Sequence, residues 1–277
     1  LEFVLQGLQA KKQAVYIAEG VLDLSSFGDF CNVSGYDHLR YAPFSPKELP
    51  CVHEKGTNAI FDYIREQDRL LHHPFDSFSI VEEFIARAAL DPDVLAIKQT
   101  LYRVSGDSPI VASLVKAAEL GKQVTVLMEV KARFDEENNI IMARRLEKAG
   151  CHVIYGLRGL KTHSKITMVV RKEGDVLRRY MHFATGNYNG KTAKYYTDCG
   201  LLTCRDTYAD DSSLFFNTIS GYAESQVWNR LIVAPLTLRQ SLMDLIDGEI
   251  QAVEAGKEGH IIAKMNSLLD KDIIAKL

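Results

Sequence analysis

The 277-residue sequence lacks the features that define several large classes of protein. It contains no run of about 20 uninterrupted apolar residues, the length that a membrane-spanning helix needs, and no recognisable signal peptide. It contains neither Gly-x-Gly-x-x-Gly nor Gly-x-x-x-x-Gly-Lys-Ser/Thr, and it has no low-complexity segment. A transmembrane protein, a Rossmann dinucleotide-binding protein and a P-loop nucleotide-binding protein are therefore disfavoured.

Cysteine is scarce, and none of the five cysteines forms a Cys-x-x-Cys pair. This pattern indicates reduced thiols rather than a disulfide framework, and it gives no zinc site. Hydrophobic residues make up 47% of the chain and charged residues 25%, which is typical of a globular protein and excludes a disordered one. We therefore expect a cytoplasmic protein with one large domain or two smaller ones. Because the chain begins with Leu1 rather than Met, we expect it to be part of a longer protein.

Helical and extended patterns alternate along the middle of the chain. Residues 1–58 have short apolar runs broken by Gly, Asp and Ser, which we interpret as short strands and a connector, the tail of a preceding α+β domain. Residues 59–230 alternate between amphipathic helices and apolar strands and form the predicted central domain. Here we predict helices at 58–71, 77–90, 108–121, 135–150 and 206–224, strands at 94–101, 123–130, 151–156 and 197–204, and a hairpin at 165–186.

The fold class follows from this alternation. Two parallel strands need a crossover connection, which is usually a helix, so a strand-helix-strand-helix-strand order predicts an α/β fold. We expect a mixed, largely parallel sheet flanked by helices, with parts of adjoining domains at both ends. Residues 231–277 are interpreted as the truncated start of a second such domain, with a helix at 237–257, a strand at 260–266 and a helix at 270–277.

Positive charge is concentrated in residues 158–196. This stretch holds nine Lys and Arg residues against two Asp and Glu residues, although the whole chain has a net charge of −3. Such a local excess in an acidic chain suggests an anionic ligand. A solvated hairpin turn would account for Arg171, Lys172 and Arg178, but not for Lys161 and Lys165, which flank a histidine.

His163-Ser164-Lys165 opens the first strand of the predicted hairpin. Residues two apart on a strand face the same way, so His163 and Lys165 should project together. A neutral imidazole beside a lysine can attack phosphorus while the lysine binds phosphate oxygens. About 20 residues later, Thr185-Gly186-Asn187-Tyr188-Asn189 offers a glycine that allows close backbone approach and an amide, Asn187, that can donate to a phosphoryl oxygen.

These motifs resemble those of a known family. The His-Ser-Lys and Thr-Gly-Asn-Tyr-Asn motifs resemble one His-x-Lys half-site of the phospholipase D superfamily, and the wider sequence resembles bacterial polyphosphate kinase, type 1. The matching segments, in order, are LLHHPFDSF, IKQTLYR, EVKARFDEENN, GLKTHSK, ATGNYNGKTAKYYTD and AKMNSLLD. One departure favours the kinase, because the phospholipase D superfamily has an aspartate five residues after the lysine, where this chain has Val170.

The resemblance implies a phospholipase D-like core that transfers the γ-phosphate of ATP to inorganic polyphosphate, reversibly, through a phosphohistidine. His163 matches the phosphorylated histidine, Lys165 would stabilise the phosphate, and Asp198 would orient or assist the histidine. Tyr196 matches a nucleotide-binding position, where its ring could stack on adenine. Further contacts to ATP or phosphate are expected from Asn187, Asn189, Lys161 and Lys194.

Arg103 and Arg133 match positions associated with the family's magnesium site. A guanidinium group has no lone pair for a cation, so we expect both to bind phosphate oxygens that also hold Mg²⁺. The spacing supports this placement, because Arg103, Arg133 and His163 follow one another at intervals of 30 residues, about the length of one βα unit. They should lie at the carboxyl ends of neighbouring parallel strands, where open α/β sheets bind ligands. Surface salt bridges to nearby acids are the structural alternative.

The expected partners are ATP, ADP and inorganic polyphosphate, with Mg²⁺ as cofactor and no nucleic acid. The full-length protein should be a cytoplasmic homo-oligomer, with attachment to the inner membrane face left open. Because a phospholipase D-like site needs two His-x-Lys-type halves and this chain has one, we expect the chain alone to be inactive or nearly so. Two alternatives remain, a phospholipase D-type phosphodiesterase and a non-catalytic polyanion-binding module.

Overall fold

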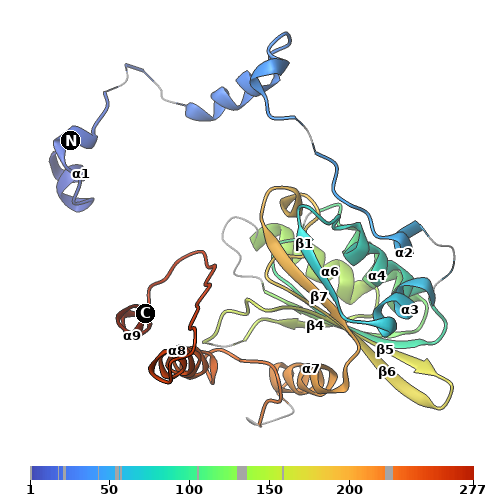
Figure 1. Ribbon diagram of the computed structural model, residues 1–277. Coiled ribbons are helices and arrows are strands. Elements are labelled where there is room, and N and C mark those ends of the chain that lie inside the picture. Colours follow the sequence, from blue (N-terminus) through green and yellow to red (C-terminus); the bar gives the residue numbers. More distant parts are fainter. Residues whose placement is uncertain are drawn as a thin grey trace. The chain divides into compact units, whose positions relative to one another are not determined.

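The computed structural model describes residues 2–17, 19–20, 23–42, 44–53, 56, 58–104, 106–129, 136–157, 159–221 and 227–277. The chain divides into two compact units, Leu1–Ser45 and Pro46–Leu277. Each unit is described by itself below. Figure 1 shows both units and labels their helices and strands where there is room.

The first unit contains only short helices among its described residues. They are the α-helix α1 (Glu2–Gly7) and the 3₁₀ helices η1 (Lys12–Ala14), η2 (Leu24–Asn32) and η3 (Asp37–Leu39). The prediction of short strands is therefore wrong for the described part of this unit. A strand needs a neighbour for its backbone hydrogen bonds, whereas here local bonds, such as the one from Val33 N to Phe30 O (3.3 Å), satisfy the backbone.

A single mixed sheet organises the described residues of the second unit, in the order β1-β7-β6-β5-β2-β3-β4. Its strands are β1 (Arg69–His73), β2 (Val94–Leu101), β3 (Gln123–Met128), β4 (His152–Tyr155), β5 (Lys165–Glu173), β6 (Val176–Ala184) and β7 (Asp198–Thr203). The prediction of a mixed α/β sheet flanked by helices is confirmed.

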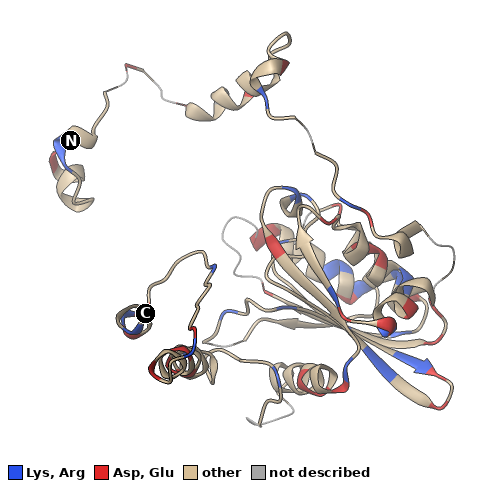
Figure 2. Ribbon diagram, viewed as in Figure 1, with Lys and Arg blue, Asp and Glu red and all other residues tan. Residues whose placement is uncertain are grey.

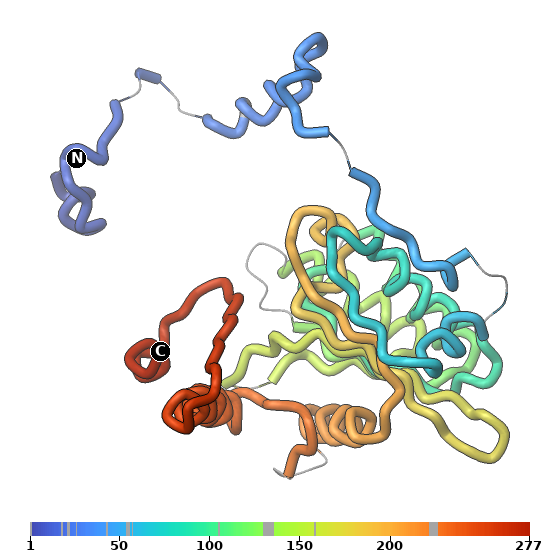
Figure 3. The backbone as a smooth tube through the Cα atoms, viewed as in Figure 1, coloured from blue at the N-terminus to red at the C-terminus, as the bar shows by residue number. Residues whose placement is uncertain are grey.

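The proportion of parallel strand pairs in the sheet differs from the prediction. Only β2–β3 and β3–β4 are parallel pairs, and the other pairs of this sheet, β1–β7, β2–β5, β5–β6 and β6–β7, are antiparallel. The prediction of a largely parallel sheet is therefore wrong. The physical reason is that parallel pairing requires a crossover, and in this sheet helical crossovers join neighbouring strands only from β2 to β3 and from β3 to β4. Strands β5 and β6 are joined instead by the short turn Gly174–Asp175, and Figure 3 shows the resulting hairpin projecting from the sheet.

Helices cover both faces of the sheet (Figure 1). One face packs against a large core that includes residues of α3 (Asn58–Glu66), α4 (Ser79–Leu90), α5 (Pro109–Glu119) and α6 (Glu136–Lys148). The other face packs against α7 (Asp206–Ile219), which contributes Ala209, Phe216 and Ile219 to a second core. On β5, Ile166 and Met168 belong to this second core and Val169 to the first, as the alternation of side chains along a strand requires.

The helix predicted at 58–71 is too long. Helix α3 ends at Glu66, and Arg69–His73 form the edge strand β1, which pairs antiparallel with β7. The apolar spacing of a helix and that of a five-residue strand overlap in so short a segment, so the periodicity could not separate them. Helix α5 begins as its sequence predicts, with Pro109 in the first turn and the Ser108 hydroxyl accepting a hydrogen bond from Val111 N (3.3 Å).

The remaining described elements are α2 (Pro50–His53), η4 (Thr192–Lys194), α8 (Leu238–Glu254) and α9 (Lys271–Lys276). The strand predicted at 260–266 is wrong, because these residues join no strand ladder and therefore stay irregular. No helix in the described ranges combines the length and the apolar character that crossing a bilayer requires.

Candidate active site

His163 and Lys165 lie where the chain enters β5. The side chain of His163 is exposed, whereas Lys165 is only 6% exposed and donates from Nζ to the backbone carbonyl of His163 at 2.6 Å. The neighbouring strand fixes this entry, because the buried Thr100 hydroxyl of β2 donates to Ser164 O (2.8 Å) and accepts from Ile166 N (3.0 Å). The histidine therefore stands at a rigid strand end.

A carboxylate at the end of β3 holds the segment before the histidine. The Glu129 side chain is 3% exposed, and its Oε2 accepts a hydrogen bond from Thr162 N at 2.8 Å. The ends of β2 and β3 and the start of β5 thus meet at one place. The charge of Arg103, which follows β2, acts on His163, which precedes β5. Because β5 runs antiparallel to β2, His163 lies before the start of an antiparallel strand and not at the carboxyl end of a parallel one, as the 30-residue spacing had predicted.

The environment of His163 keeps its imidazole neutral. Partial burial lowers the pKa of His163, and the positive charges of Lys165, Lys161 and Arg103 lower it further. Burial also lowers the pKa of Lys165, to about 8, although the negative charge of Asp198 opposes that shift. An uncharged imidazole beside several cations is a nucleophile placed where an anion would bind.

An aromatic ring that the sequence analysis did not single out lies at the centre of this cluster. The ring of Tyr102 lies 5.5 Å from the ring of His163 at an interplanar angle of 74°, in an edge-to-face arrangement. Its centroid is 5.4 Å from Lys161 Nζ, 5.4 Å from Lys165 Nζ and 5.7 Å from the guanidinium carbon of Arg103. The sequence feature that could have identified Tyr102 is its position directly after a predicted strand and before Arg103.

Hydrogen bonds anchor the Thr-Gly-Asn-Tyr-Asn segment to other parts of the fold. Tyr188 is 2% exposed, and its hydroxyl accepts from Thr167 Oγ1 of β5 at 2.8 Å. Asn189 donates from Nδ2 to Arg103 O (3.3 Å) and accepts at Oδ1 from Lys191 N (3.0 Å). The Asn189 amide is thus occupied by backbone contacts that position the Arg103 segment. Asn187 keeps a buried Oδ1 with no hydrogen-bond partner among the described residues.

Asp198 begins β7 and faces the same region. Its Oδ1 accepts from the Thr185 hydroxyl at 2.8 Å, and its Oδ2 lies where a Cβ on Gly186 would approach to 2.5 Å. Only glycine therefore fits at position 186 without displacing the carboxylate. Within the described part of the chain, no hydrogen bond joins Asp198 to His163, and the influence that the structure shows is the charge of Asp198 on Lys165.

The other predicted ligands differ in their placement. Lys161, Lys194 and Tyr196 are exposed, and the Tyr196 side chain has 62% of its surface accessible. Burial raises the pKa of Glu82 on α4, and the charge of Lys194 opposes that shift, so Lys194 lies near a helix carboxylate. Arg133 lies outside the described residues.

Metal ligation finds little support around His163. Among the described residues, no group of three or more His, Cys, Asp or Glu side chains lies close enough together to hold a metal ion. Lysine and arginine cannot ligate a cation, so the side chains that surround His163 fit phosphate oxygens and not Mg²⁺ itself. We derive no reaction step through a metal held by this chain.

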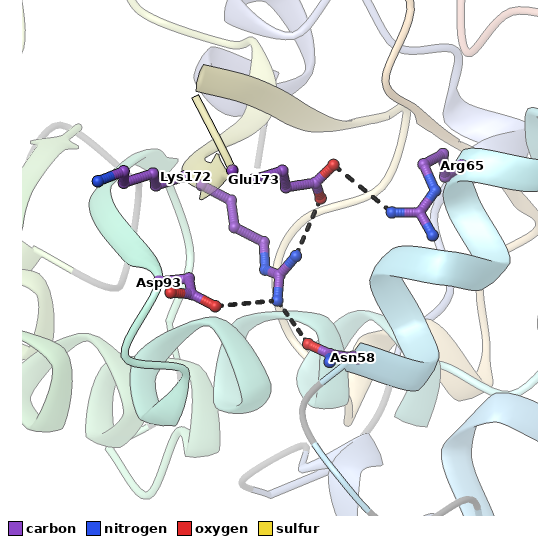
Figure 4. Close-up of a pocket in the computed structure, with 7 residues that line it drawn as sticks. Asn58, Arg65, Asp93, Lys172 and Glu173 are labelled. Atoms are coloured by element: carbon purple, nitrogen blue, oxygen red, sulfur yellow. Dashed lines mark hydrogen bonds and ion pairs between the residues drawn. The ribbon is translucent and has the colours of Figure 1, made fainter. Parts of the chain in front are cut away.

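A second charged region lies at the opposite end of β5 (Figure 4). Its residues line a pocket of about 480 Å³. Arg171, whose side chain is 8% exposed, is the centre of the ion pairs in this region. Arg171 pairs with Asp91 (2.9 Å), Glu173 (3.0 Å) and Asp93 (3.5 Å) and also donates to Asn58. The expectation that Arg171 belongs to a solvated turn is wrong, because carboxylates from the α4–β2 connection bury and pair it. The neighbouring Lys172 is exposed, as expected.

Comparison with known proteins gives consistent matches. A profile of the family "Polyphosphate kinase C-terminal domain 1" matches residues 59–225, and a profile of "Polyphosphate kinase C-terminal domain 2" matches residues 231–277. The chain is 54% identical over 279 residues to the polyphosphate kinase of Halalkalibacterium halodurans, covering 100% of this chain and 39% of that protein. It is 58% identical over 220 residues to the polyphosphate kinase of Parasynechococcus marenigrum, covering 79% of this chain and 31% of that protein.

A solved structure is similar over nearly the whole chain. The crystal structure of polyphosphate kinase from Porphyromonas gingivalis is 32% identical in sequence and superposes with a TM-score of 0.79. The match covers 95% of this chain and 44% of that chain. The chain therefore spans between 31% and 44% of the length of these relatives.

Proposed function

The chain belongs to the polyphosphate kinase family, and from this membership and the geometry around His163 we propose that the protein transfers the γ-phosphate of ATP reversibly to inorganic polyphosphate. The observation that carries the proposal is the exposed imidazole of His163 among Lys161, Lys165 and Arg103, where burial and these charges lower its pKa. In the described residues, no carboxylate pairs with Lys161 or Lys165, so their charge is available to an anion.

The reaction proceeds in two half-reactions through a phosphohistidine. A ring nitrogen of His163 attacks the γ-phosphorus of ATP, a nitrogen–phosphorus bond forms, the bond to the bridging oxygen breaks and ADP leaves. A terminal oxygen of polyphosphate then attacks the same phosphorus, the nitrogen–phosphorus bond breaks, and the polymer is longer by one phosphate. Phosphoryl transfer needs mainly positioning and charge stabilisation, which fixed cations supply.

The remaining side chains have supporting roles in this proposal. Lys161, Lys165, Arg103 and Arg133 bind phosphate oxygens, and Asp198 assists the histidine through its charge, which favours the charged form of Lys165. Tyr196 stacks on adenine, with Asn187 and Lys194 along the path of the phosphates. Asn189 acts through the backbone of Arg103 rather than on the nucleotide. Bound Mg²⁺ would supply positive charge to the same phosphate oxygens.

We also propose that this chain carries one half of a phospholipase D-like site. The division into a tail (1–58), a first catalytic domain (59–230) and the start of a second (231–277) accompanies that proposal, as do a cytoplasmic homo-oligomer and ATP, ADP and polyphosphate as partners. The test compares the 277-residue chain with a protein extended to the length of the curated relatives. ATP-dependent polyphosphate synthesis by the short chain at the rate of the long one would refute the half-site proposal.

The experiment that tests the phosphohistidine uses the extended protein, γ-labelled ATP and Mg²⁺, with an alkaline quench. We expect label that survives alkali and is lost in acid, and we expect none in His163→Ala. The matched control is His152→Ala, because His152 is an exposed histidine on the edge strand β4. Equal labelling of the parent and His163→Ala would show that the phosphorylated residue is not His163. Diester hydrolysis without nucleotide would favour the phosphodiesterase instead.

A further inference from the structure

The ring of Tyr102 lies near the imidazole of His163 and near three cations beside it. Lys161, Lys165 and Arg103 each have their charge within 6 Å of its centroid, and His163 lies edge-to-face with it. These three cations are the same ones that lower the pKa of His163. One aromatic ring therefore links the nucleophile to its surrounding charges.

Tyr102 is also held at a defined place by the backbone. The fully buried Asn139 of α6 donates from Nδ2 to Tyr102 O (3.4 Å) and to Glu129 O (3.1 Å). Glu129 N donates in turn to Leu101 O at 2.9 Å, so the ends of β2 and β3 are joined directly. The ring thus projects from a junction of two strands and a helix, and not from an unsupported loop.

Packing alone does not account for the ring. Tyr102 is only partly buried and belongs to neither of the two apolar cores. Lys161 and Lys165 place two like charges beside one imidazole, and these charges repel each other before an anion binds. The negative face of an aromatic ring attracts cations and offsets part of that repulsion.

We propose that Tyr102 is the positioning residue of this site, whose ring gathers Lys161, Lys165 and Arg103 around His163 before the phosphate arrives and fixes the orientation of the imidazole. The inference rests on the proposed phosphoryl transfer for its purpose, but the arrangement that it describes exists without substrate. The ring is the active part, and the hydroxyl is dispensable. An anion then meets a preformed cluster, which lowers the cost of ordering side chains on binding.

The test substitutes Tyr102 with a series of side chains that change or remove the aromatic ring. Tyr102→Phe keeps the ring, fluorinated phenylalanines at the same position weaken its negative face stepwise at nearly constant shape, and Tyr102→Leu removes it. The probes are the affinity for tripolyphosphate, measured by calorimetry, and the pKa of His163, measured by histidine NMR with His163→Ala for assignment. Phosphohistidine formation from labelled ATP gives KM and kcat separately in the extended protein.

We expect Tyr102→Phe to bind tripolyphosphate within about twofold of the parent and Tyr102→Leu about tenfold more weakly, since each contact contributes about twofold to fivefold. Affinity should fall stepwise with fluorination, and the pKa of His163 should rise stepwise as Lys161, Lys165 and Arg103 move away from it, with Asp198 still facing Lys165. In the kinetics, KM should rise more than kcat falls.

Unchanged affinity and unchanged His163 pKa across the fluorinated series would overturn the proposal, whether or not Tyr102→Leu folds. A loss in Tyr102→Phe equal to that in Tyr102→Leu would overturn it too, because the hydroxyl would then be the active part. If the parent binds no tripolyphosphate and forms no phosphohistidine, the proposed function fails. The NMR series then still decides whether Tyr102 organises the cluster.

Discussion

The two ends of strand β5 carry positive charge in opposite ways. At the first end, Lys165 bonds to a backbone carbonyl and lies with Lys161 and Arg103 around the ring of Tyr102. At the other end, Arg171 is buried among Asp91, Asp93 and Glu173. No carboxylate among the described residues pairs with the two lysines of the first end, whereas the charge of Arg171 is paired within the fold.

Charge density alone would have pointed to the end at which the charges are paired. Figure 2 shows Lys and Arg concentrated on β5 and β6 near their hairpin turn, which is the Arg171 end. That end also has the pocket of about 480 Å³. Its arginines are neutralised, however, since Arg178 also pairs with Glu173 at 2.9 Å and Arg179 pairs with Asp210 at 2.8 Å. The informative property of a cation in a candidate site is therefore its partner, not its presence.

The largest expected effect contrasts the two lysines of β5. Lys165→Ala should slow phosphohistidine formation by about 10²–10³-fold, the usual result of removing one preorganised donor to a transition-state oxygen. Lys172→Ala, on the exposed side of the hairpin end, should stay within about twofold of the parent because it contacts no reacting group. Rapid-quench labelling with γ-labelled ATP measures both rates. Similar rates for the two variants would abolish the distinction between the two ends.

The second effect concerns stability at the Arg171 end. Arg171→Met should lower the free energy of unfolding by about 3 kcal/mol, because it leaves Asp91, which is 1% exposed, without its cationic partner. Arg65→Ala is the matched control, since Arg65 belongs to the same network but is 46% exposed, and it should cost less than about 1 kcal/mol. Urea unfolding followed by circular dichroism measures both. Equal losses would mean that burial does not distinguish these arginines.

Local sequence patterns were sufficient for part of this comparison. The chemistry of a His-x-Lys pair needs only two side chains, so His163 and Lys165 could be singled out from the sequence, although β5 begins at Lys165 and His163 precedes it. Ser108 and Pro109 likewise mark a helix start by themselves.

The rest depends on contacts between segments far apart in the chain. Nothing near Tyr102 in the sequence shows that β5 begins beside it, because that neighbour is set by the antiparallel pairing of β2 and β5. Arg171 was expected in a solvated turn because the sequence around it does not show its main partner. That partner, Asp91, lies at the end of α4, far away in the chain. Asn189 could be recognised as polar and near the site, but only the fold shows that its amide is used by Arg103 O.

The smallest effect is a pH dependence confined to the Arg171 end. Burial alone would raise the pKa of Glu173, but the hydrogen bonds from Tyr180, Arg178 and Arg171 outweigh it and lower the pKa from 4.5 to about 2. The stabilisation by Glu173 is therefore complete well above pH 4.5 and is lost as the pH falls from there towards 2, because the unfolded chain takes up the proton first.

Between pH 7 and pH 4 the parent should lose about 1 kcal/mol more stability than Glu173→Gln, whose amide does not titrate. The comparison is made by urea unfolding at both pH values, so that the titration of all other carboxylates cancels between the two proteins. Parallel stability curves for the parent and Glu173→Gln would show that the Arg171 end does not depend on an ionised Glu173.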